Sequence, residues 1–226
     1  MNLDRVTVAT SNNADLYEAV MDAHCVESVR EQGVFRVLGT PPPYFSVLTT
    51  LEPGWGVYVM NLRPAGFKDA FHEIEAADHG YNLLFTSSWI WLESPQVTEP
   101  QLTWKEATNY TEQAEWQDRW WGVHATERTT IYPASMVENS DFRFLTAFDH
   151  DQPLGCAMLN RSDSVIGISN LFAFQGSDLS LWRDIAGVAA RRFPGMPLCG
   201  YERDDSLGNA RSSGFEAIGQ LRVWTL

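Results

Sequence analysis

The chain has 226 residues, of which 44% are hydrophobic and 12% aromatic, enough to bury a substantial core. Its apolar runs are shorter than the roughly 20 residues of a membrane-spanning helix, and Met1 to Arg5 does not resemble a secretory leader, so we expect a cytoplasmic protein without membrane association. A net charge of −13 argues against DNA binding, because that affinity depends on Lys and Arg neutralising phosphates.

The negative charge is concentrated in one part of the chain. Residues 1–139 hold 8 basic and 19 acidic side chains (8 − 19 = −11), whereas residues 140–226 hold 8 and 10 (8 − 10 = −2). An acidic half can attract an amine-bearing partner, and the alternative is a solvated surface that maintains solubility. The three cysteines, Cys25, Cys156 and Cys199, fit neither a disulfide framework nor a zinc site, and we expect reduced thiols.

The first half predicts a helix, three strands, a second helix and a long strand. Ser11 can cap the first helix, whose apolar residues recur at three- and four-residue spacing until Gly33 ends it. The later elements are predicted as strands at 34–38, 44–50 and 55–60, a helix near 67–79 and a strand at 82–92.

The second half repeats this order of elements. We predict a helix near 111–121, strands at 142–148, 155–160 and 165–174, a helix at 178–193, a strand at 198–202, a helix at 205–213 and a strand at 215–224. The repetition predicts a mixed α/β fold of two related modules, residues 1–110 and 111–226, the first truncated.

The last 85 residues or so carry a pattern that resembles the GNAT superfamily of N-acetyltransferases. It consists of "GCAMLN" opening at Gly155, the central strand "SVIGISNLFAF", the helix "DLSLWRDIAGVAARRF", the strand "PLCGYE", and Gly214-Phe215 before "QLRVW". The resemblance implies a mixed, mostly antiparallel central sheet flanked by helices, in which the central strand and the strand after the long helix splay apart. Tandem members also exist, so residues 1–110 resemble a degenerate GNAT-like module beside an acyltransferase domain at 111–226.

The resemblance also implies a position for acetyl-CoA as co-substrate. Its pantetheine arm would pair along the central strand, and its pyrophosphate would bind backbone amides where the next helix begins. The sequence departs from the family after Gly176, where Asp178 adds a negative charge, and at Ala210, where members often have a tyrosine that acts as general acid. The residues expected to contact acetyl-CoA are Leu171, Phe172, Ala173, Gln175, Gly176 and Ser177.

Acyl transfer to an amine requires a base, and a carboxylate near the cleft can serve. Glu202 ends the strand expected to line the splay and is the first candidate; the alternative is a cap or an ion pair with Arg203 or Arg211. Tyr201 should point to the opposite face of that strand and so lie outside the site of Glu202. Ser169 and Asn170 interrupt an apolar strand, so one of them faces the acceptor, or the two pair with neighbouring strands or mark a β-bulge that opens the splay.

Other polar side chains have simpler explanations. His72, Glu75 and His79 share one face of the helix predicted at 67–79, but a solvated polar face explains them, and we expect no metal. His124 and His150 lie in predicted loops as less favoured candidate bases. The tryptophans follow core periodicity, although some can wall an acceptor pocket.

These observations favour an acyl-CoA-dependent N-acyltransferase that moves an acetyl group to an amine of a small molecule or peptide, as a monomer or homodimer. Two alternatives stay open: a GNAT-fold binding protein that has lost cofactor use, and a transferase that uses another donor, such as aminoacyl-tRNA.

Overall fold

A computed structural model describes residues 3–124 and 129–226. Over these residues, five α-helices flank one mixed sheet. The helices are α1 (Leu3–Ala23), α2 (Gly56–Leu62), α3 (Tyr110–His124), α4 (Leu179–Arg192) and α5 (Asp204–Ser212), with short 3-10 turns at Ala77–His79 and Ala134–Glu138. The strands are β1 (Ser28–Glu31), β2 (Val34–Val37), β3 (Leu48–Thr50), β4 (Gly66–Asp69), β5 (Asn82–Leu92), β6 (Thr103–Glu106), β7 (Phe142–Asp149), β8 (Gln152–Arg161), β9 (Ile166–Ala173), β10 (Leu198–Glu202) and β11 (Glu216–Thr225).

All eleven strands belong to one sheet, in the order β1-β2-β3-β4-β11-β5-β10-β9-β8-β7-β6. Two neighbouring pairs, β3 with β4 and β9 with β10, are parallel, and every other pair is antiparallel. A helix connects the strands of each parallel pair, α2 in the first case and α4 in the second. The mixed, mostly antiparallel sheet predicted from the sequence is confirmed.

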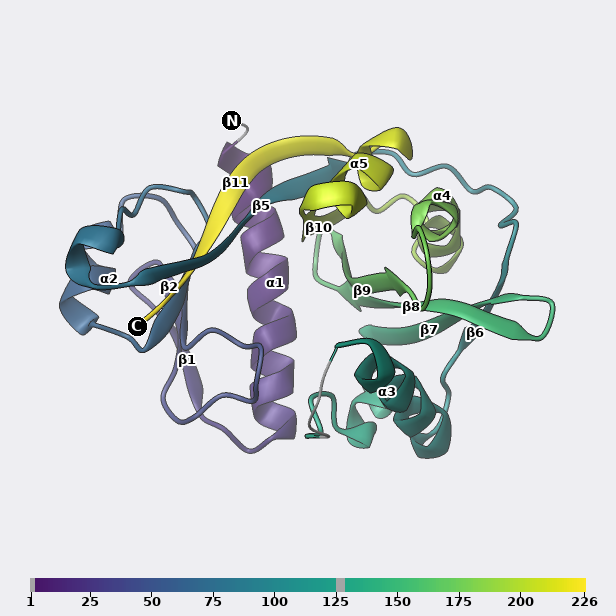
Figure 1. Ribbon diagram of the computed structural model, residues 1–226, viewed down its shortest axis with the longest axis horizontal. Coiled ribbons are helices and arrows are strands. Elements are labelled where there is room, and N and C mark those ends of the chain that lie inside the picture. Colours follow the sequence, from purple (N-terminus) through teal and green to yellow (C-terminus); the bar gives the residue numbers. More distant parts are fainter. Residues whose placement is uncertain (1–2, 125–128) are drawn as a thin grey trace.

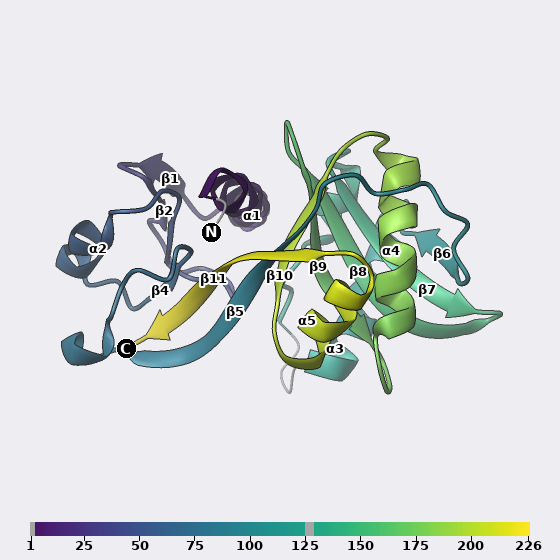
Figure 2. The ribbon, with the colours of Figure 1, turned by 90° about the horizontal axis from the view of Figure 1, so that it is seen from above.

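The sheet has the same topology on either side of its centre. Strands β1 to β4 follow one another as β7 to β10 do, and the last strand of each half lies in the other half. Strand β11 pairs with β4, β5 pairs with β10, and β5 and β11 pair with each other between the halves (Figure 2). The sheet therefore consists of two halves with the same strand order, joined by exchange of their final strands. The boundary at residue 110 stays a prediction; β6 precedes it and pairs with β7.

Several predicted elements of the first half are wrong. Residues 55–60, predicted as a strand, lie mostly in α2, and the helix predicted near 67–79 is β4 followed by a loop and a 3-10 turn. The first helix begins at Leu3 and ends at Ala23, so Val29 belongs to β1. Periodicity misled because β4 has four residues and is largely buried, and short buried strands lack the alternation that marks longer ones.

The helices cover the second half of the sheet on both sides. Helix α1 runs between the two halves, and α3 and α4 lie on opposite sides of β7 to β9 (Figure 1). Side chains of α1 and α3 pack with Phe144 and Met158, whereas α4 and α5 pack with Leu145 and Leu159. We call these two sides the α1/α3 face and the α4/α5 face. Among the described residues, no helix has the length and apolar composition needed to cross a membrane.

Candidate active site

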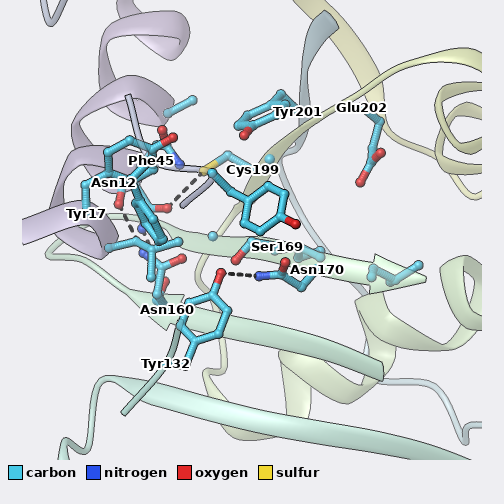
Figure 3. A pocket seen from close by; sticks show the side chains of 18 of the residues that line it. Asn12, Tyr17, Phe45, Tyr132, Asn160, Ser169, Asn170, Cys199, Tyr201 and Glu202 are labelled. Atoms are coloured by element: carbon cyan, nitrogen blue, oxygen red, sulfur yellow. Dashed lines mark hydrogen bonds between the residues drawn. The ribbon is translucent and has the colours of Figure 1, made fainter. Parts of the chain in front are cut away.

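A gap opens between the two parallel strands of the second half. Strands β9 and β10 pair only at Ile166–Leu198 and Gly167–Cys199, and then they separate. At Gly200 a Cβ atom would lie 2.7 Å from the Ile168 carbonyl oxygen, so glycine allows the last close approach before the strands part. A cavity of about 350 Å³ lies at this β9/β10 gap (Figure 3). The predicted splay is therefore present.

A β-bulge shapes the cavity wall on β9. Cys156 faces Phe172 and Met158 faces Ser169, so residues 170 and 171 together oppose one residue of β8. Asn170 has a left-handed backbone with φ of 51°. A β-bulge is therefore present, but it consists of Asn170 and Leu171, and Ser169 stays in register with Met158.

The bulge gives the side chains of Ser169 and Asn170 different environments within the cavity wall. The Trp120 indole donates a hydrogen bond of 3.0 Å to Asn170 Oδ1, and Asn170 Nδ2 donates one of 2.8 Å to the Tyr132 hydroxyl (Figure 3). Ser169 Oγ, in contrast, is buried and has no hydrogen-bond partner within residues 3–124 and 129–226. Asn170 is therefore held by its neighbours, whereas the Ser169 hydroxyl is available to a ligand.

Tyr201 and Glu202 both line the cavity, from opposite faces of β10. Tyr201 packs edge-on against Trp89 on the α1/α3 face, and Glu202 lies at the other end of the cavity from Tyr17 and Phe45 (Figure 3). The expectation that Tyr201 lies outside the site of Glu202 is wrong, because the cavity passes through the gap and reaches both faces of the sheet.

The carboxyl group of Glu202 is strongly perturbed. Burial raises its pKa to about 8, with repulsion from Asp178 adding to the effect and Arg203 opposing it. The interaction with Asp178, at the start of α4, puts Glu202 on the α4/α5 face. At neutral pH the group is mostly protonated, so it is a carboxylic acid that can donate a hydrogen bond or a proton.

The turn between β9 and α4 presents unused backbone donors. Gln175, Gly176 and Ser177 are exposed, and within the described chain the N–H groups of residues 175–178 donate to no protein atom. They precede a helix of 14 residues, whose N-terminal dipole favours anions. The turn is thus suited to phosphate oxygens.

The Asp178 carboxylate has three side-chain partners. Its carboxylate is buried and accepts hydrogen bonds from Asn209 Nδ2 at 2.6 Å, from Trp182 Nε1 at 3.3 Å and from the Ser206 hydroxyl. The bonds from Ser206 and Asn209 join the start of α4 to α5. Further along α5, residue 210 is a fully buried alanine. The position where GNAT members often have a tyrosine therefore carries no acidic group.

Of the other histidines and cysteines, Cys199 lines the cavity, whereas His150 and Cys156 do not. His150 is exposed in a hairpin turn beside Asp149, and burial raises the thiol pKa of Cys156 to about 12 and that of Cys199 further. The side chain of His124 lies outside the described residues. His72, Glu75 and His79 share no helix face, and over the described parts of the chain no three His, Cys, Asp or Glu side chains group as metal ligands would.

The sequence reasoning missed much of the cavity wall. Asn12, Asn13 and Tyr17 line it from α1, and Tyr132 lines it from the loop after α3. A detectable signal existed in α1, because Asn12 is a buried polar residue within an apolar helix and such a group needs a partner. Asn12 Nδ2 donates to the Ser162 hydroxyl at 2.8 Å, which ties the helix to the second half.

The corresponding gap in the first half, between β3 and β4, is closed. These strands pair at Leu48–Phe67 and Thr49–Lys68, as β9 and β10 do at two positions. The Thr50 hydroxyl then bridges them: it accepts from the Ala70 N–H at 2.9 Å and contacts the Lys68 carbonyl oxygen at 3.5 Å. A side-chain hydroxyl thus joins the strands where β9 and β10 separate.

The turn before α2 also differs from the turn before α4. Leu51 and Glu52 donate their N–H groups to the Gly33 carbonyl oxygen, Gly54 donates to Glu73, and Pro53 has no N–H. The N–H groups of this turn are therefore unavailable to phosphate. Over the described residues, the gap between β3 and β4 is therefore closed, and the turn at 51–54 offers no free N–H group.

Solved structures resemble the chain over nearly its whole length. A GCN5-related N-acetyltransferase from Kribbella flavida aligns with a TM-score of 0.63 and 15% identity, covering 96% of this chain and 94% of that one. Another from Sphaerobacter thermophilus aligns with 0.55 and 14%, covering 96% and 89%. A functionally unknown conserved protein from Staphylococcus epidermidis aligns with 0.59 and 15%, covering 88% and 93%. No protein-family model and no curated protein matches the chain. The chain has the fold of the GNAT superfamily of N-acetyltransferases.

Proposed function

We propose that the protein is an acyl-CoA-dependent N-acyltransferase that transfers an acetyl group to an amine of a small molecule or peptide. The observation that carries this proposal is the contrast between the two turns that follow β3 and β9. The free N–H groups of residues 175–178 lie beside an open gap. The corresponding N–H groups at 51–54 donate hydrogen bonds within the protein or, at Pro53, are absent. Selection for a phosphate-bearing ligand explains why only one turn keeps its donors.

The edge of β9 supports the same assignment. Among the described residues, β10 pairs with β9 only as far as Gly167, so the edge of β9 beyond this point faces the cavity and can receive an extended ligand. Leu171, Phe172 and Ala173 would pair with the pantetheine arm, and Gln175, Gly176 and Ser177 would hold the pyrophosphate. Bound acetyl-CoA supplies an activated thioester, and the remaining chemistry belongs to the protein's own side chains.

Two side chains at the gap suit two different steps of the transfer reaction. The free Ser169 hydroxyl can donate a hydrogen bond to an oxyanion that develops on the thioester carbonyl, and Asn170 holds the bulge that orients it. Glu202 is protonated near neutral pH and lies on the face reached from α4 and α5, so it can return a proton to the departing thiolate. This role replaces the one expected of a tyrosine at Ala210.

The test is calorimetric titration with CoA of the parent and two matched variants. Ser177→Pro removes one free N–H from the exposed turn, as Pro53 does in the first half, and should weaken CoA binding by roughly 10- to 100-fold, the effect of one hydrogen bond to a charged group. Pro53→Ser, the reverse change in the first half, should leave CoA affinity unchanged. Equal CoA affinity in all three proteins would mean that CoA does not bind at the turn of residues 175–178.

A screen of amines with acetyl-CoA, read by release of free thiol, then separates the functions. Thiol release supports the transferase. Saturating CoA binding without thiol release would make the protein a binding module, and the absence of binding would point to a different donor or to lost cofactor use. At 100 times its dissociation constant CoA should stabilise the fold by about 2.7 kcal/mol, so a thermal-shift assay gives an independent reading.

A further inference from the structure

A lysine is buried beneath the α1/α3 side of the cavity, and no carboxylate in the described part of the chain pairs with it. Lys68 comes from β4 of the first half and is 1% exposed. Its Nζ donates to Asn13 Oδ1 at 2.6 Å, to the Tyr17 hydroxyl at 2.9 Å and to the Tyr201 hydroxyl at 3.5 Å. The same nitrogen lies 4.5 Å from the ring centres of both tyrosines. Both hydroxyls belong to residues that line the cavity.

The groups packed around Lys68 are nearly all uncharged. Helix α1 contributes Asn13 and Tyr17, β10 contributes Tyr201, and the neighbouring strands contribute Thr49 and Val223 at the same register. Among the described residues no carboxylate contacts Nζ, and burial alone lowers the pKa of Lys68 to about 7. Near neutral pH the amine therefore exists in both its protonated and its neutral forms.

A base on this side of the gap is what the proposed reaction lacks. An amine arrives mostly as an ammonium ion and must lose a proton before it attacks. Of the residues that line the cavity, Glu202 is the one with a carboxylate, and it lies on the α4/α5 face. The α1/α3 face is lined by aromatic rings and amides, with Lys68 behind two of its hydroxyls.

We propose that Lys68, acting through the Tyr201 hydroxyl, accepts the proton of the acceptor amine. The inference rests on the proposed function. Tyr201 is the catalytic residue: its oxygen takes a proton from the substrate ammonium while its own O–H proton passes to the neutral Nζ of Lys68. One N–H bond of the substrate breaks, one N–H bond forms on Lys68, and Tyr201 ends unchanged. The positive charge thereby moves from the substrate to Lys68, which releases its proton after product leaves.

The first test needs no turnover and uses the fact that the chain has two lysines, Lys68 and Lys105. Protein labelled with ¹³C at lysine Cε gives two signals, and Lys105→Arg assigns them. We expect the Lys68 signal to titrate between about pH 6 and 8. A Lys68 signal that stays in its protonated position up to pH 9 overturns the inference, whether or not acetyl transfer is found.

The second test follows turnover of the amine found by the screen. Tyr201→Phe keeps the ring and should lower kcat/KM by ~100-fold or more at pH 7 while CoA affinity is unchanged. Lys68→Arg keeps a charge that cannot be lost and should abolish the rise of kcat/KM with pH through 7. Tyr81→Phe, which removes a buried hydroxyl bonded to the Pro64 carbonyl away from the cavity, is the control and should keep parental activity and pH profile.

The outcomes separate a failure of the Lys68–Tyr201 relay from a failure of the proposed function. If Tyr201→Phe and Lys68→Arg both fold and keep the parental pH profile, the relay is overturned and N-acyl transfer stands. Should Lys68→Arg fail to fold, Tyr201→Phe and the lysine titration still decide. A parent protein that binds CoA yet acetylates no amine overturns the proposed function, and the relay with it.

Discussion

The two gaps in the sheet have the same strand topology, but the gap between β3 and β4 is closed and the gap between β9 and β10 is open. Between β3 and β4, the Thr50 hydroxyl bridges the strands and the following turn uses its N–H groups internally. Between β9 and β10, Gly200 permits one last close approach, a bulge bends β9 away, and the following turn leaves its N–H groups free. Strand topology alone therefore does not open a cavity. Whether one forms depends on a few hydrogen bonds at the point where the two strands separate.

The closed half still contributes to the open one. Because the final strands are exchanged, β4 lies near the middle of the sheet, and Lys68 reaches Tyr201 of the second half. In the proposed relay the first half thus supplies Lys68 as the base, while no described carboxylate of residues 1–139 lines the cavity. This distribution agrees with the alternative in which the acidic residues form a solvated surface.

The largest expected effect concerns the open gap. Glu202→Gln should lower turnover by about 10²- to 10⁴-fold with little change in CoA affinity, because proton transfer is lost and binding is not. Steady-state kinetics across pH 6–10 make the measurement. If Glu202 donates the proton, raising the pH should not rescue the variant; partial recovery at high pH would make it the base that the sequence suggested.

The same substitution has an effect on stability with a defined sign. Since the folded-state pKa of Glu202 is about 8 against an ordinary value of 4.5, its contribution to the parent's stability is lost as pH rises through this range. Glu202→Gln should therefore become more stable than the parent above pH 8, by an amount on the order of a few kcal/mol, and should lose this advantage below pH 4.5. Urea unfolding at pH 4, 7 and 9 checks the trend; a pH-independent difference contradicts it.

A substitution at the closed gap should change the stability of the protein but not its affinity for CoA. Thr50→Val keeps the shape of the side chain but leaves the buried Ala70 N–H without its acceptor, which costs about 1–3 kcal/mol. Urea unfolding gives the stability, and titration with CoA gives the affinity. A variant with weaker CoA binding at temperatures where it is fully folded would show that the first gap also takes part in cofactor binding.

The smallest expected effect links Asp178 to Glu202. Asp178→Asn removes the repulsion that helps to raise the pKa of Glu202, so the loss of activity at alkaline pH should begin at a lower pH than in the parent. The kcat–pH profile of the two proteins provides the comparison. An unchanged alkaline limb would mean that Glu202 does not control it.

Much of the second half was predictable from local pattern. Helix α4 and strands β7 to β11 have enough residues for periodicity to identify them, and the motifs around Gly155, Gly176 and Gly214-Phe215 indicated the fold. The sequence also indicated the departures at Asp178 and Ala210. It misassigned β4 and α2, because a four-residue buried strand and a helix of 7 residues hold too few turns or alternations to be told apart.

Only the tertiary structure decided how the cavity is built. Lys68 meets Tyr17 across 51 residues of sequence and Tyr201 across 133, and no local pattern records such a meeting. The opposite orientations of Tyr201 and Glu202 followed from strand alternation, but their shared cavity depends on β9 and β10 parting at that point. The sequence by itself determined the fold class and the strand that carries Glu202. The exchange of final strands decided that Lys68 lies beside Tyr201, because it brings β4 and β10 into one sheet.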